Sequence, residues 1–430
     1  MDRAPLLSEL MPWSVAGLRT GRGWVLSPYP EVLVARWQRL AEAPAERRAV
    51  LFGPSRSRTV ESSVPQLPGQ AASSNRLSRD PGPCPQPVQI RHGAFDRLWL
   101  LPDQRVLDQP RPELWRVADA AQVFATVQPA DADGPGVVCS AELPDGWRGR
   151  GVGRIHPLYR RPGGLEPNVA PGLLRRLGRV LDLRVTAEDL LAWITAITAA
   201  PEVAPAAVVT AVPGARTGVQ AAAAPGAPAG PGARSGEEVS VPVPASAELW
   251  REGVGLGRRL VWLQSFGARF GTAPGDRPRM PGGRRPFVRE RVGGWPEALA
   301  YEAETESLLL GDGRLAPVAA AAWEFRAGGA PVLAEWFERR MPDAEVRPGS
   351  LEALGLGDWP QEYTAELVEL LTVLSLSAEL RPALRELRRG PWLSASDLAA
   401  AGVLPVPPWC RRPASVLCRE EGPEGQFVLL

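Results

Sequence analysis

The chain contains no lysine, so all 49 of its basic side chains are arginine. A phosphate-binding loop, a Schiff-base enzyme and the common restriction-nuclease centre each need a lysine amine, and none of these sites can be built from this sequence. Histidine is almost as scarce, with two residues in 430. His156 has no cysteine, serine nucleophile or second histidine at helical spacing beside it, which favours a packed or hydrogen-bonded role over a catalytic one.

Cysteine is also rare, and the four residues form no CxxC pair: Cys84, Cys139, Cys410 and Cys418. Their spacing predicts no metal site and is typical of free thiols in a reduced, cytoplasmic protein. No apolar run approaches the roughly 18 residues needed to span a bilayer. Asp2 and Glu9 interrupt the N-terminal segment, which is therefore not expected to be a signal peptide.

Excess charge of either sign is missing as well, because the net charge is +1. The chain as a whole therefore has no strong positive field that would by itself indicate a nucleic-acid partner. Locally, however, arginines cluster. The segment from Arg277 to Arg291 contains six arginines and one acidic residue, Glu290, and the segment from Trp147 to Arg161 contains five arginines and no acidic residue. Such clusters either neutralise phosphates at a specific site or form solvated loops, and the sequence leaves both interpretations open.

What is present indicates a folded protein with many loops, since 44% of residues are apolar and there are 15 tryptophans, 47 prolines and 44 glycines. Apolar periodicity predicts helices from Pro30, over Leu173–Leu181, and from Thr186, Ser246, Thr364 and Ser394. It predicts strands in Gly136–Leu143 and Ile155–Tyr159, and a hairpin over Ser307–Val318 with Gly311–Gly313 as its turn.

Gly253, Gly255 and Gly257 resemble a dinucleotide-binding loop in spelling alone. They lie inside a helical pattern with no preceding strand, where glycine permits close packing.

Two stretches lack periodicity. Residues 53–89 have the composition of a linker, and residues 201–238 are almost free of charge and rich in alanine, proline and glycine. We therefore expect an α+β fold of small mixed sheets with packed helices. Its two lobes, residues 1–200 with mixed strands and helices and residues 239–430 with helices and a β-hairpin, are joined by a flexible linker over 201–238.

The chain is organised around Ile90–Trp115, where arginines, aromatics and aspartates alternate at short spacing. Apolar residues on both sides of Pro102-Asp103 predict two short strands meeting at a tight bend. Arginines mounted there either pair with Asp96 or Asp108 in a structural network or reach phosphates and guanine edges.

This stretch resembles the signature of the C-terminal specificity region of type ISP restriction-modification enzymes. The matching residues are Phe95, Asp96, Arg97, Trp99, Pro102, Asp103, Pro110 and Pro112. His92, Gly93 and Ala94 depart from the family's usual lead-in. A second match lies near the N-terminus, at Pro12, Trp13, Gly17, Arg22, Trp24, Pro30, Leu33, Arg36 and Trp37. The resemblance extends from about Pro12 to Pro413 and implies that residues 53–89 are ordered.

Full-length members of that family carry a nuclease, a helicase motor and an adenine N6-methyltransferase before this region. The chain lacks the Asn/Asp-Pro-Pro-Tyr/Phe tetrapeptide that lines a flipped adenine, and it lacks a glycine-rich loop after a strand for the methyl donor. The resemblance therefore implies a DNA target-recognition subunit of a restriction-modification or anti-phage defence system. It would bind double-stranded DNA and position a separate methyltransferase, and a helicase-nuclease, with methyl donor and ATP on those partner chains and no cofactor of its own.

The predicted DNA contacts are nine arginines: Arg22, Arg91, Arg97, Arg105, Arg111, Arg154, Arg160, Arg284 and Arg285. The predicted scaffold of the signature is Phe95, Asp96, Trp99 and Asp103. No catalytic set is recognisable, so enzyme activity of the chain by itself is not expected. The rival hypothesis is a truncated structural or interaction protein of the same family, in which Asp96 and Arg97 only maintain the fold.

Overall fold

The computed structural model describes residues 3–71, 73–129, 134–146, 153–199, 238–271, 275, 277, 279–343 and 345–414. The helices are α1 (Leu7–Leu10), α2 (Pro30–Glu42), α3 (Ala45–Phe52), α4 (Pro112–Trp115), α5 (Leu173–Leu181), α6 (Ala187–Ala199), α7 (Ala247–Gln264), α8 (Ala320–Trp323), α9 (Val332–Glu338), α10 (Gln361–Glu379), α11 (Arg381–Glu386) and α12 (Ala395–Ala400). Short 3-10 turns are η1 (Pro162–Gly164), η3 (Pro281–Gly283) and η4 (Pro408–Arg411).

The strands form several small antiparallel sheets. One sheet has the order β1 (Val15–Ala16), β7 (Arg154–Pro157), β5 (Phe124–Val127), β6 (Val137–Ser140). A second has the order β2 (Leu26–Ser27), β4 (Asp96–Leu100), β3 (Val88–His92), and a third β11 (Phe287–Glu290), β14 (Gly313–Ala316), β13 (Ser307–Leu310), β12 (Leu299–Glu302). Pairs are formed by β8 (Tyr159–Arg161) with β9 (Leu165–Pro167), β10 (Val243–Pro244) with β17 (Trp392–Leu393), and β15 (Arg326–Ala327) with β16 (Ala330–Pro331). The predicted α+β class is confirmed.

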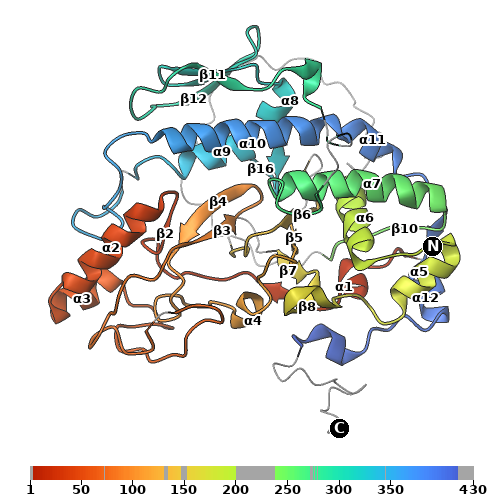
Figure 1. The fold of residues 1–430 in the computed structure, drawn as a ribbon, viewed down its shortest axis with the longest axis horizontal. Coiled ribbons are helices and arrows are strands. Elements are labelled where there is room, and N and C mark those ends of the chain that lie inside the picture. The colour runs from red at the N-terminus through yellow and green to blue at the C-terminus, as the bar shows by residue number, and fades with distance from the viewer. Residues whose placement is uncertain are drawn as a thin grey trace, which may run out of the picture.

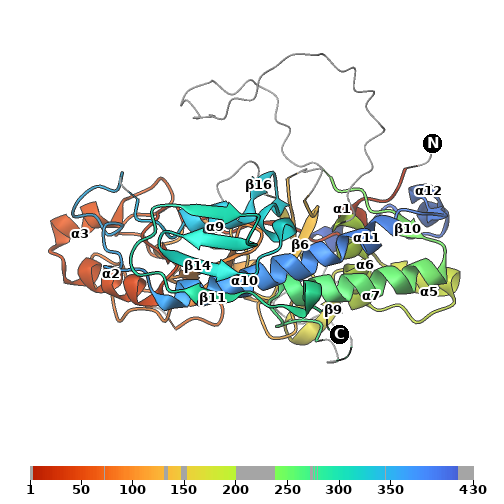
Figure 2. The same ribbon diagram turned by 90° about the horizontal axis from the view of Figure 1, so that it is seen from above.

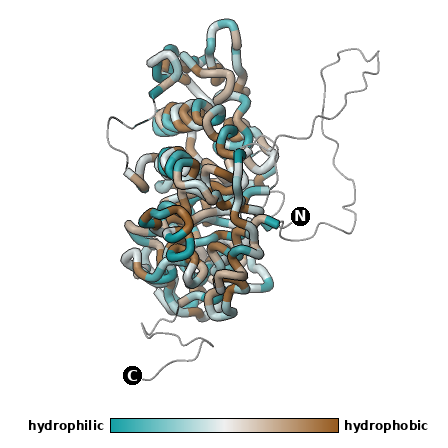
Figure 3. The backbone as a smooth tube through the Cα atoms, turned by 90° about the vertical axis from the view of Figure 1, so that its right-hand side faces the viewer, coloured by the Kyte–Doolittle hydropathy of each residue, from teal (hydrophilic) through white to brown (hydrophobic). Residues whose placement is uncertain are grey.

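The elements stack in layers. Figure 1 shows α10 crossing the molecule between the β11–β14 sheet above and the β2–β4 sheet below. In the view from above, α7 lies next to one end of α10 and runs towards α5 (Figure 2). Figure 3 shows the stack from the side, with hydrophobic segments in every layer. Helices α6 and α7, for example, both contact β6 of the first sheet.

Two apolar cores hold these layers together. The larger one includes residues from before and after the predicted linker, such as Trp193 of α6 and Trp250 of α7, whose rings stack with centroids 5.6 Å apart. The smaller one gathers Trp13, Trp24 and Trp37 of the N-terminal region. Residues 201–237 lie outside the described residues, and the predicted lobe boundaries stay a prediction.

Most predicted elements are present. The helix from Pro30 buries the predicted apolar face, and Thr186 and Ser246 accept hydrogen bonds from the backbone N–H groups of Asp189 and Leu249 at their helix starts. The predicted hairpin is β13–β14. The described part of residues 53–87 has no helix or strand, yet Leu67 and Leu77 are buried in the smaller core, so this segment is ordered, as the resemblance implied.

Helices α6 and α7 approach closely because α7 carries glycine where they meet. A Cβ atom built on Gly257 would lie 1.8 Å from the backbone oxygen of Ala192, and one on Gly253 would lie 2.3 Å from the Trp193 ring. Gly255 faces open space. The interpretation that glycine permits close packing is confirmed for Gly253 and Gly257 but not for Gly255.

Candidate nucleic-acid interface

The signature stretch forms a β-hairpin, but not at the predicted place. Strand β4 pairs with β3, with Ile90 opposite Leu98, and Gly93 at φ +63 makes the turn. The predicted bend at Pro102-Asp103 between two strands is wrong. After Leu100 the chain forms a turn in which Val106 donates its N–H to the Asp103 carbonyl over 3.1 Å. Residues 101–107 therefore do not form the predicted second strand.

Asp96 of this hairpin joins it to two helices. Its carboxylate accepts hydrogen bonds from Arg339 over 3.2 Å and from both terminal nitrogens of Arg340 over 3.0 and 3.3 Å. The backbone N–H of Arg97 donates to the same carboxylate over 2.8 Å. Arg340 also donates to Glu366 of α10 over 2.7 Å. The hairpin, the end of α9 and α10 therefore meet at one charge network.

The environment fixes the charges of this network. Burial opposes ionisation of Asp96, but Arg340 and Arg339 outweigh it and hold the pKa of Asp96 below its ordinary value. Burial raises the pKa of Glu366 in spite of Arg340, and the pKa of Arg340 is raised because the two carboxylates outweigh its own desolvation. Asp96 and Arg340 are thus a buried ion pair.

Arg339 and Arg340 follow directly after α9. Arg340 is 4% exposed, whereas Arg339 is half-buried. The burial of Arg340 could have been predicted, because it follows the buried Trp336 by four residues, about one helical turn later.

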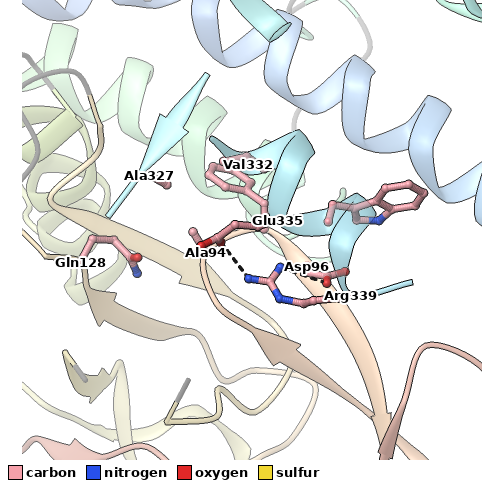
Figure 4. A pocket seen from close by; sticks show the side chains of 9 residues that line it. Ala94, Asp96, Gln128, Ala327, Val332, Glu335 and Arg339 are labelled. Carbon is pink, nitrogen blue, oxygen red and sulfur yellow. Dashed lines mark hydrogen bonds and ion pairs between the residues drawn. The ribbon is translucent and has the colours of Figure 1, made fainter. Parts of the chain in front are cut away.

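A pocket opens beside Arg339, between the hairpin and α9 (Figure 4). Arg339 points across it between Asp96 and Glu335, and it donates to Glu335 over 2.8 Å. Gln128 lies on the opposite wall. The carboxylates of the pocket are already paired with Arg339, and its lining contains no histidine or cysteine. The pocket therefore offers neither a nucleophile nor a transition-metal site.

The side chains of Arg91 and Arg97 extend from the hairpin towards the end of α7. Arg91 is 2% exposed and donates to Glu142 over 2.8 Å, and its guanidinium lies 5.0 Å from the Phe266 ring centroid. Arg97 lies 4.0 Å from the centroid of the same ring and pairs with Glu369 of α10, while remaining half-buried. Both guanidiniums therefore form ion pairs with carboxylates of the protein itself.

Arg105 and Arg22 are also buried. Arg105 and Asp103 are each 1% exposed and joined by contacts as short as 2.6 Å. Both terminal nitrogens of Arg105 also donate to backbone carbonyls within residues 75–81. Arg22 pairs with Asp108 over 3.3 Å. Contact with DNA would require these arginines to leave interior partners, so the structure favours the structural alternative for them.

Two aromatic residues of the predicted scaffold pack within the protein. Phe95 is buried and meets Phe325 edge-to-face, with ring centroids 5.5 Å apart. Trp99 lies opposite Gln89 in the β3–β4 pair and packs on the smaller core.

Three further predicted contacts lie elsewhere. Arg160 is buried and pairs with Glu166. Arg111 is half-buried at a positive φ of 57, and its side chain donates to Gln109 over 2.9 Å. Arg154 is exposed, although it donates to the hydroxyl and carbonyl oxygens of Ser14.

Arg284 and Arg285 are exposed beside β11. Arg284 pairs with Glu306 over 2.8 Å at the surface. The structure thus divides the nine predicted DNA contacts into a buried group, Arg22, Arg91, Arg105 and Arg160, a half-buried pair, Arg97 and Arg111, and three exposed residues, Arg154, Arg284 and Arg285. The exposed residues lie on separate segments from the signature.

His156 and Cys139 are buried, and burial keeps both side chains uncharged. Burial lowers the pKa of His156 to about 4, and its Nδ1 contacts the Met11 carbonyl over 2.8 Å. Burial raises the pKa of Cys139 to about 12, so its thiol stays protonated. In the described part of the chain no three His, Cys, Asp or Glu side chains are placed to hold a metal ion. Nor is any helix there both long and apolar enough to cross a membrane.

A family model described as the Type ISP C-terminal specificity domain matches residues 9–203 and 237–370. The unmatched interval coincides with most of the predicted linker. The search of curated proteins returned no match.

Three solved structures share the fold. A DrdV–DNA complex determined by cryo-electron microscopy aligns with a TM-score of 0.55 at 15% identity, covering 90% of this chain and 38% of that one. The ATP-dependent Type ISP restriction-modification enzyme LlaBIII bound to DNA gives 0.54 at 10% identity, covering 89% and 24%. A nuclease-deletion mutant of the Type ISP enzyme LlaGI, in complex with a DNA substrate mimic, gives 0.50 at 11% identity, covering 91% and 29%. The chain therefore spans well under half of each of these proteins.

Proposed function

The chain belongs to the family of type ISP C-terminal specificity domains, and from this membership we propose that it recognises a target sequence in double-stranded DNA. The family match over most of the chain carries the proposal. The shared fold with three type ISP or related enzymes in DNA complexes supports it. The exposed arginines supply groups that contact phosphates or the edge of guanine.

The finer part of the proposal concerns partners. The 430 residues contain no adenine-gripping tetrapeptide and no methyl-donor loop, and the described residues form no catalytic set. We infer that this chain chooses the DNA site, whereas a methyltransferase and a helicase-nuclease on other chains bind the methyl donor and ATP.

Selection from a pool of randomised duplexes tests the proposal. The purified full chain is incubated with the pool at moderate salt, alone and with a type ISP methyltransferase supplied as a separate chain, and bound duplexes are sequenced. Enrichment of one motif is expected in at least one condition. The absence of any enriched motif in both conditions would contradict DNA recognition.

The choice of variants decides whether such a test separates DNA recognition from a structural role. Removing Arg105 would mainly unfold the chain, because its guanidinium is buried against Asp103 and three backbone carbonyls. Loss of binding in that variant would say nothing about DNA contact. Variants for a binding assay must therefore be taken from the exposed arginines.

A further inference from the structure

Strand β11 lies at the edge of its sheet, hydrogen-bonded to β14 on one side. All four of its residues are exposed, including Phe287 at 46% and Val288 at 40%. Aromatic and β-branched residues such as Phe287 and Val288 favour strands because their side chains usually pack against neighbouring side chains. An exposed apolar edge strand is also a site at which another molecule can bind. The surface formed by β11 and its flanking residues 284–291 is called the β11 edge here.

The β11 edge carries positive charge that the protein does not neutralise. In the described ranges, no acidic side chain forms an ion pair with Arg285, Arg289 or Arg291, and all three are exposed. Arg284 is the one arginine of the edge with such a partner, Glu306. The signature residues Arg91 and Arg105 are the opposite case, since each forms an ion pair with a carboxylate inside the fold.

Local backbone geometry holds one of these cations in place. The pairing of β11 with β14 shifts register between Val288 and Glu290, so Arg289 is the extra residue of a β-bulge. Its guanidinium lies 4.1 Å from the centroid of the Phe287 ring. A stacked guanidinium loses less side-chain freedom when it binds a ligand, because the ring already restricts it.

We propose that the β11 edge contacts the duplex of the target DNA, with Arg285, Arg289 and Arg291 binding phosphates along one strand. This inference rests on the proposed function and locates it on a surface apart from the signature hairpin. Charge complementarity selects the ligand, because a polyanion supplies a negative partner for every unpaired arginine.

A charge-matched pair of variants tests the location. The first is R285A/R289A/R291A. The control is R175A/R179A/R184A, which removes three exposed arginines with no ion-pair partner among the described residues, on and just after α5. Figures 1 and 2 both place α5 well away from β11. Because every substituted side chain is exposed, unchanged melting temperatures are expected for both.

Affinity of the full chain for its selected duplex is then measured by fluorescence anisotropy over a series of salt concentrations. For the β11-edge variant we expect binding at least about tenfold weaker, and a slope of log K against log salt shallower by about 0.9 for each lost phosphate contact. The control should keep both values. A lysine variant, R285K/R289K/R291K, should keep the slope because it keeps the charges.

The outcomes separate the two proposals. If wild-type protein selects a motif and the β11-edge variant binds it with unchanged affinity and slope, the DNA lies elsewhere and this inference is overturned, while the proposed function stands. The inference is overturned in the same way if the control loses as much affinity as the β11-edge variant. If wild-type protein binds no duplex, either alone or with the methyltransferase, both proposals are overturned.

Discussion

Replacing Gly257 by alanine should destabilise the protein, whereas the same replacement at Gly255 should not. Both residues lie in α7, two positions apart, and both substitutions add one methyl group to a helix. At Gly257 that methyl would lie 1.8 Å from the Ala192 backbone oxygen, but at Gly255 nothing lies within 4 Å. The pair therefore separates close helix packing from helix propensity.

The expected magnitude combines two opposing effects. Alanine in a helix interior gains about 0.5–1 kcal/mol over glycine, which is the whole effect expected for G255A. At Gly257 the clash is with backbone, so α6 and α7 must move apart, and overpacking of this kind costs about 1–3 kcal/mol or more. The same movement loosens the stacked Trp193 and Trp250 rings. We expect G257A to lose about 2 kcal/mol net, so the two variants should differ by roughly 3 kcal/mol.

Urea unfolding followed by tryptophan fluorescence measures the difference. The midpoint for G257A should fall and that for G255A should rise slightly, with similar slopes. A G257A protein as stable as wild type would refute the inferred contact between the helices. A G255A protein that is strongly destabilised would show instead that α7 is packed on the face that the structure leaves open.

Asp96→Ala should cost about 3–5 kcal/mol, because it leaves the buried Arg340 without one of its carboxylates. Glu306→Ala, which breaks the exposed pair with Arg284, should cost no more than about 1 kcal/mol, and equal urea midpoints for the two variants would contradict the network. The pKa of His156 is lowered to about 4, so the folded protein keeps this side chain neutral while the unfolded chain takes up a proton near 6.5. Stability should therefore be complete above about pH 6.5 and fall towards pH 4, by about 2 kcal/mol at pH 5. His156→Gln should remove that part of the pH dependence, and an unchanged profile in this variant would exclude His156 as its source.

Local regularities allowed the sequence alone to predict much of the fold. The helix beginning at Thr186 was recognisable because its apolar spacing and its cap with Asp189 depend on neighbouring residues. The hairpin β13–β14 was recognisable for the same reason. The signature bend was misplaced because the partner of β4 lies on its N-terminal side, across Gly93, where the pattern is weaker.

The family itself was also decided by the sequence, since the resemblance carried by the signature residues is confirmed by the family match. The sequence could not decide which arginines face solvent. Arg340 meets Asp96, and Arg91 donates to the Gln264 carbonyl, across long separations in the chain.

The availability of a guanidinium for an external ligand depends on whether folding brings carboxylates and carbonyl groups around it. That arrangement is a property of contacts between distant segments, which one-dimensional spacing does not record. Tertiary structure therefore buried Arg22, Arg91, Arg105 and Arg160 but, among the described residues, left Arg285, Arg289 and Arg291 exposed and without an ion-pair partner.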